Sequence, residues 1–111
     1  MMPPSKRKRV ARVTVSIDSD LEELVPGFLE NRRKDSKALC SAAQTRDLNT
    51  VRLLGHRMKG DGGGYGFQQI SQIGEALEEA AMKEDWKMII EQTEALTAFL
   101  ARVDVVYRGK D

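Results

Sequence analysis

Residues 47–67 read DLNTVRLLGHRMKGDGGGYGF, a helical pattern that runs into a glycine-rich segment. Asp47 is a residue type that caps helices. Apolar residues then recur at helical spacing: Leu48, Val51, Leu54 and Met58. Glycines follow at positions 60, 62, 63, 64 and 66, and glycine disfavours helix. We therefore expect a helix from about residue 48 that ends within the glycines, or that continues through them only because packing holds it.

Segments on both sides of this stretch also have helical periodicity. Upstream, Asp18 and Asp20 can cap a short helical turn, and Pro26 then interrupts the pattern. A longer helix is expected to follow, through Ala43. Downstream, one helix is expected from about Phe67, with its buried stripe at Phe67, Ile70, Ile73, Gly74, Leu77 and Ala81. Another begins at Asp85 and carries apolar residues as far as Tyr107.

Four amphipathic helices with short connections predict an all-α fold, an antiparallel up-down four-helix bundle. Residues 13–17 alternate apolar and polar side chains, which is typical of extended backbone. An isolated strand does not form a stable sheet, so we expect an extended N-terminal lead-in without a partner. We place the basic tail and lead-in at 1–17 and the bundle domain at 18–108.

The charge of the chain is unevenly distributed. Its 111 residues have a net charge of +1, yet residues 1–12 contain no acid. The basic residues of this tail are Lys6, Arg7, Lys8, Arg9 and Arg12. Such a tail can bind nucleic acid. However, the remaining chain is net acidic and has no basic face with interleaved aromatics, so we expect no nucleic-acid partner.

The composition also excludes several kinds of protein. Cys40 is the single cysteine, which rules out an intrachain disulfide and fits a reducing cytosol. No cysteine and histidine spacing indicates a metal site. No apolar run approaches the roughly 20 residues of a membrane span, and the basic start lacks the apolar core of a signal peptide. We expect a cytoplasmic protein with no membrane partner.

His56 is the one histidine of the chain, and it is expected to face solvent. On a helical wheel it lies roughly 160° from the apolar cluster of its helix, with Arg52 and Lys59 each within about 60° of it. A neutral imidazole is a good nucleophile near pH 7. Lys59, one turn along, can reach the oxygens of a phosphoryl group on that ring, and Arg52 is a weaker candidate for the same role.

The surroundings of His56 suggest a docking face for a partner protein. Gly60 and Gly63 leave the imidazole without bulky neighbours, and glycines on an exposed helix indicate a packing or docking requirement. Leu53 lies about 60° from His56 on its open side, where an apolar side chain can contact a partner helix. We therefore assign Arg52, Leu53, Gly60 and Gly63 to this face.

The segments Gly55–Gly60 and Gly64–Phe67 resemble the signature of the histidine phosphotransfer (HPt) family, in its stand-alone bacterial form. That signature has an apolar residue, a lysine and a glycine two, three and four positions after the histidine, and a glycine ten positions after it. The resemblance implies a four-helix bundle whose exposed histidine is phosphorylated at Nε2. It also implies that Glu78, on the following helix, orients His56 through Nδ1. The helical wheel independently places Glu78 at the edge of its helix's apolar stripe.

The sequence therefore predicts a phosphocarrier of a two-component phosphorelay rather than a free-standing enzyme. His56 would exchange a phosphoryl group with an aspartate of a response-regulator receiver domain or a hybrid histidine kinase. We expect a monomer without cofactors, with magnesium held by the receiver. The alternative is a docking-only module that has the HPt fold and regulates a partner without phosphotransfer.

Asp61 departs from the family pattern, which usually has a small neutral residue there. A carboxylate near the phosphoryl site would repel it, slowing transfer or narrowing the choice of partner. On the wheel Asp61 lies about 140° from His56, which favours a side chain that points away.

Overall fold

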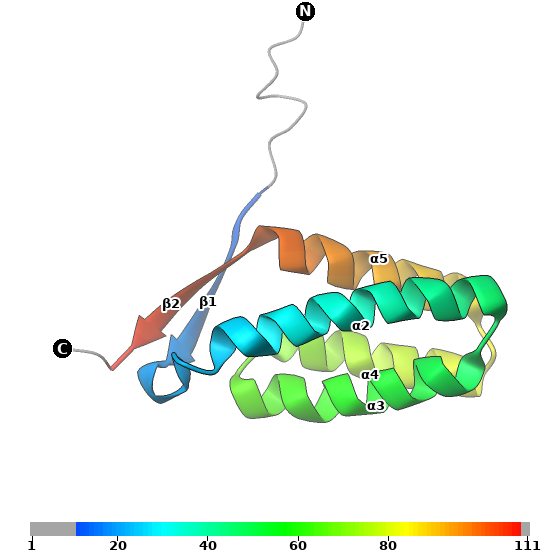
Figure 1. The fold of residues 1–111 in the computed structure, drawn as a ribbon, viewed down its shortest axis with the longest axis horizontal. Coiled ribbons are helices and arrows are strands. Elements are labelled where there is room, and N and C mark those ends of the chain that lie inside the picture. Colours follow the sequence, from blue (N-terminus) through cyan, green and yellow to red (C-terminus); the bar gives the residue numbers. More distant parts are fainter. Residues whose placement is uncertain (1–10, 110–111) are drawn as a thin grey trace, which may run out of the picture.

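The computed structural model describes residues 11–109, in which four long helices form an antiparallel bundle with a pair of strands at one end (Figure 1). The elements in order are β1 (Val13–Asp18), a 3-10 turn (Ser19–Leu21), α2 (Val25–Thr45), α3 (Leu48–Tyr65), α4 (Gln68–Met82), α5 (Trp86–Arg102) and β2 (Val103–Arg108). The predicted all-α four-helix bundle is confirmed, with the strand pair as a small addition.

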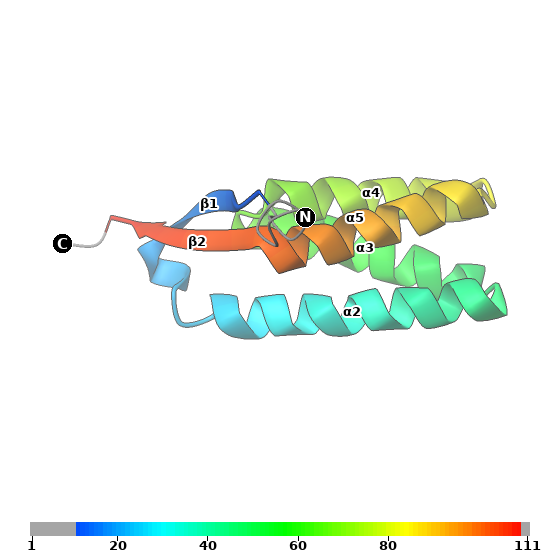
Figure 2. The ribbon, with the colours of Figure 1, turned by 90° about the horizontal axis from the view of Figure 1, so that it is seen from above.

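Each helix of the bundle packs mainly against two neighbours. Consecutive helices run in opposite directions and α5 returns to contact α2, so that α3 and α5 lie diagonally opposite each other (Figures 1 and 2). The core between them is built from fully enclosed side chains of every helix, among them Leu39, Met58, Leu77, Ile89 and Leu96. The opposite side of each helix is mostly polar. No helix within residues 11–109 is long and apolar enough to cross a membrane.

The helix ends follow from local sequence. Asp47 and Asp85 cap α3 and α5 as predicted, because each carboxylate accepts a hydrogen bond of 3.1 Å from the backbone N–H three residues on. Pro26 does not interrupt a helix. It lies in the first turn of α2, after the 3-10 turn, where a missing N–H costs no hydrogen bond.

The helix α3 continues through the glycine stretch and ends only at Gly66, which has a φ of +86°. Packing explains this continuation. A Cβ at Gly62 would lie only 2.5 Å from the backbone nitrogen of Ser71 on α4. Glycine there lets the two helices approach closely, and this contact offsets the low helix propensity of the segment.

The predicted fourth helix is too long. The structure ends α5 at Arg102, and residues Val103–Arg108 form β2, which pairs in parallel with β1 from Val13 opposite Val103 to Asp18 opposite Arg108. The expectation that residues 13–17 have no partner strand was wrong for the same reason. Valines at 103, 105 and 106 favour extended backbone, and the distant segment 13–18 supplies the partner that sequence periodicity did not reveal.

Candidate functional site

His56 lies in the middle of α3 with its side chain directed to solvent, and 72% of that side chain is exposed. Its Nδ1 lies 2.9 Å from Oε2 of Glu78 on α4, within hydrogen-bonding distance. The Glu78 side chain is only 21% exposed, so it is held between the helices while the imidazole projects from them. The contact between these two residues, which the resemblance implied, is present in the structure.

This contact determines which nitrogen of the ring is free. An ionised carboxylate can only accept hydrogen bonds, so the proton of a neutral imidazole belongs on Nδ1, facing Glu78. The lone pair then lies on Nε2, on the far side of the ring. The arrangement presents a nucleophilic nitrogen to a partner and stabilises positive charge on the ring after a bond forms at Nε2.

Two glycines place α3 and α4 at the separation that this contact needs. A Cβ at Gly55, next to His56, would lie 2.7 Å from the backbone nitrogen of Glu78. A Cβ at Gly74 would lie 2.6 Å from the carbonyl oxygen of Gly55 and would also overlap the backbone of Lys59. Neither glycine was given this role from the sequence, although a glycine inside each predicted helix is a usable signal of close approach.

Lys59 lies one turn after His56 on the exposed side of α3. Within residues 11–109 its ammonium forms no ion pair, so its positive charge is available near the imidazole. Its backbone carbonyl accepts a 2.7 Å hydrogen bond from the hydroxyl of Ser71 on α4. Ser71 was not identified from the sequence, and it adds a second link between the helices beside the histidine.

The residues predicted for the docking face are exposed around His56. Leu53 is 45% exposed, and a Cβ at Gly60 would have no atom within 4 Å. A Cβ at Gly63 would meet only the Ser71 hydroxyl, at 3.9 Å. Arg52 is also exposed and donates to the side chain of Asn49, at 3.0 Å. The face is therefore open, and its role in docking stays a prediction.

Asp61 is directed toward α2 rather than toward His56. Its carboxylate lies 3.6 Å from Nη1 of Arg32, a buried arginine of α2 that also stacks over the Phe28 ring and contacts Asp35. Burial raises the pKa of Asp35, while Arg32 and then Arg57 oppose that increase. The negative charge of Asp61 is thus paired at the interface of α2 and α3, away from the face that α3 shares with α4.

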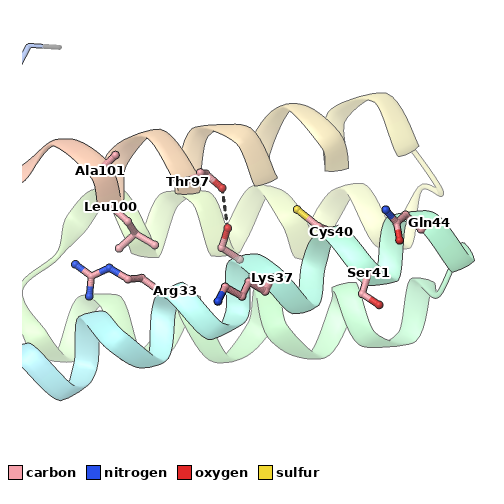
Figure 3. Close-up of a pocket in the computed structure, with 9 residues that line it drawn as sticks. Arg33, Lys37, Cys40, Ser41, Gln44, Thr97, Leu100 and Ala101 are labelled. Carbon is pink, nitrogen blue, oxygen red and sulfur yellow. Dashed lines mark hydrogen bonds between the residues drawn. The ribbon is translucent and has the colours of Figure 1, made fainter. Parts of the chain in front are cut away.

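A groove of about 640 Å³ lies between α2 and α5 (Figure 3). Its rim carries Arg33 and Lys37, and the hydroxyls of Ser36 and Thr97 meet across it at 2.7 Å. Because α2 and α5 lie opposite the α3 and α4 pair, this groove is separate from His56. Within residues 11–109 no three metal-ligating side chains gather at either place.

Comparison with protein-family models finds the Hpt domain over residues 23–105, a range that contains all four helices of the bundle. No curated protein and no solved structure matches the chain. The matched range contains the whole of α3 and α4, with His56 and Glu78 in contact between them. Fold, site geometry and family model agree, and the chain belongs to the Hpt domain family.

Proposed function

We propose that this chain is a phosphocarrier of a two-component phosphorelay, in which His56 accepts a phosphoryl group from a receiver-domain aspartate and donates it to another. The observation that supports this most directly is an exposed imidazole whose Nδ1 is engaged by Glu78, which leaves Nε2 free. Involvement in phosphorelay signalling follows from the family. That the phosphoryl group is carried on His56 itself goes beyond what family membership implies, and it is the part that we propose.

The transfer step can be written atom by atom. The Nε2 lone pair attacks the phosphorus of an aspartyl phosphate, the N–P bond forms and the P–O bond to the aspartyl oxygen breaks. The leaving aspartate keeps that electron pair as a carboxylate. The ring, now positively charged, keeps its proton on Nδ1, where Glu78 accepts the hydrogen bond. Lys59 stabilises the phosphoryl oxygens, and the reverse sequence returns the group.

The partner supplies what this chain does not provide. We propose that a response-regulator receiver, or the receiver of a hybrid histidine kinase, brings the aspartate and the magnesium ion. It would dock on the open face around Leu53 and Gly60, where exposed apolar surface and missing side chains allow close approach. The protein is then a carrier rather than a free-standing enzyme, and we propose that it works in the bacterial cytoplasm.

A phosphotransfer assay tests the proposal. Receivers from the same cell are labelled with radioactive phosphate and mixed with wild-type chain or His56→Ala. We expect label on the wild type only, stable in alkali and labile in acid, as phosphohistidine is. Because His56 is the single histidine, such label reports this position alone. Equal labelling of both chains would exclude the proposal.

The docking-only alternative predicts a different outcome. A His56→Gln variant keeps a polar side chain of similar reach on the same exposed surface but cannot carry a phosphoryl group. If it binds the receiver and sustains signalling in cells as well as the wild type, the chain acts by docking alone. If it binds but does not signal, phosphotransfer is required.

A further inference from the structure

The groove between α2 and α5 has the size and shape of a small-molecule site. Its volume of about 640 Å³ lies within the range of roughly 300–1,000 Å³ that is usual for ligand pockets. Part of its wall is buried, since Ser36 and Leu100 are only 9% and 7% exposed. Small side chains line much of the rest, among them Cys40 on α2 and Thr97 and Ala101 on α5 (Figure 3). The protein therefore leaves this space between its own helices unfilled.

The two hydroxyl groups that meet across the groove are occupied by hydrogen bonds within the chain. The Thr97 hydroxyl donates to the Thr93 carbonyl oxygen at 3.1 Å, so it accepts in its 2.7 Å contact with Ser36. Ser36 in turn donates its proton to Thr97. Neither hydroxyl has a proton left for a ligand, and the neighbouring surface of Leu100 and Ala101 is apolar. This part of the groove is therefore suited to the apolar part of a ligand rather than to a polar group.

The rim of the groove is positively charged. Arg33 and Lys37 lie one turn apart on α2, and within the described part of the chain no acidic residue lines the groove. Arg33 is partly engaged, because its guanidinium lies 3.4 Å from the carboxylate of Glu30. Lys37 forms no ion pair among residues 11–109, so its ammonium is free to bind a negative group. An unpaired cation at the edge of apolar surface favours a ligand that is both anionic and apolar.

We propose that this groove binds a small amphipathic carboxylate, of the chemical class of medium-chain fatty acids. The carboxylate lies beside the Lys37 ammonium, and the hydrocarbon chain covers Leu100, Ala101 and Cys40. Contact between the chain and the groove removes apolar surface of both from water, and this supplies most of the binding free energy. The charge of Lys37 selects the sign of the head group and fixes the orientation of the ligand.

The outline of the groove favours a slender molecule over a helix of another protein. On α2 its lining extends from Arg33 to Gln44, about 16 Å of helix, but on α5 it extends only from Thr97 to Ala101, about 6 Å. A docked helix is roughly 10 Å wide and needs both walls along its length, whereas a single hydrocarbon chain does not. Because His56 lies on the opposite pair of helices, binding in the groove is independent of the proposed phosphotransfer.

NMR titration of the full chain with octanoate tests the proposal. We expect saturable shifts of the backbone amide signals of residues 33–44 and 97–101, with a dissociation constant on the order of 1 mM. Octylamine has a hydrocarbon chain of similar length but a positive head group, and it should bind at least roughly tenfold more weakly. Equal binding of the two probes would overturn the proposal. So would the absence of saturable shifts in these residues at octanoate concentrations roughly tenfold above the expected constant.

Matched variants separate the role of Lys37 from that of net charge. Lys37→Glu should raise the dissociation constant of octanoate by about tenfold, whereas Lys34→Glu, at an exposed position outside the groove lining, should change it by less than about twofold. Cys40→Trp places a large side chain in the groove and should weaken binding by at least about tenfold. All three positions are exposed, so the variants are expected to fold like the wild type.

Two outcomes of these measurements would refute the site. One is an equal effect of Lys37→Glu and Lys34→Glu, because binding would then depend on net charge alone. The other is a wild-type chain that sediments as a dimer while Cys40→Trp sediments as a monomer, because a second copy of the chain would then cover the groove.

Discussion

Replacing Gly74 by alanine should separate α3 from α4 and disconnect His56 from Glu78. The added Cβ would lie 2.6 Å from the carbonyl oxygen of Gly55, whereas ordinary van der Waals contact begins at 3.4 Å. The Cβ is bonded directly to the α4 backbone and the carbonyl oxygen belongs to the α3 backbone, so no flexible side chain can move away instead. The helices must therefore separate by at least about 0.8 Å at this crossing, because the Cβ also overlaps the backbone of Lys59.

Such a shift is large enough to break the site contact. The Nδ1 to Oε2 distance of 2.9 Å between His56 and Glu78 would increase to about 3.7 Å, which is no longer a hydrogen bond. Overpacking of this kind typically costs about 1–3 kcal/mol in the free energy of unfolding. The gain in helix propensity, about 1 kcal/mol, acts in the opposite direction.

A control variant removes the propensity contribution from the comparison. Gly64 is in α3, and a Cβ there would have no atom within 4 Å, so Gly64→Ala changes propensity without overpacking. We expect Gly74→Ala to be less stable than Gly64→Ala by about 1–3 kcal/mol, or roughly 4–8 °C in Tm for each kcal/mol. Urea and thermal denaturation measure this difference, and nitrogen NMR of the imidazole reports how the two tautomers of His56 are populated.

Equal stability of the two variants, with an unchanged tautomer of His56, would contradict this expectation. The helices would then not be held apart by the glycine contacts. A loss of stability without a change in tautomer would show that the contact with Glu78 adapts to the separation, and the positioning role of Gly74 would be wrong.

Three further changes test the site and the fold. Glu78→Gln removes the charged acceptor of His56 and should slow phosphotransfer by about tenfold or more, while Glu79→Gln, on the exposed side of α4, should leave the rate unchanged. Asp85→Ala should lower the free energy of unfolding by about 1 kcal/mol because the cap of α5 is lost, and Asp85→Asn should retain most of it. Burial raises the pKa of Asp35, so its folded form favours the proton, and this residue's contribution to stability falls as pH rises above 3.8. The free energy of unfolding of the wild type should therefore fall relative to that of Asp35→Asn as pH rises above 3.8. A difference between the two that stays constant with pH would contradict this expectation.

The sequence predicted the features that depend on local chemistry and helical periodicity. Asp47 and Asp85 cap their helices because a carboxylate beside free N–H groups needs no tertiary partner. The outward direction of His56 followed from its angle to the apolar stripe, and the family resemblance is confirmed by the match over residues 23–105. These features are encoded within a few helical turns.

The tertiary structure alone decided what depends on contacts between distant segments. The helix α5 ends at Arg102 because the valine-rich segment after it pairs with β1, which lies near the other end of the sequence. The continuation of α3 through its glycines follows from the backbone of α4. The direction of Asp61 follows from Arg32 of α2. In each case backbone packing or an ion pair outweighs local propensity, because a neighbour that is remote in sequence supplies the larger interaction.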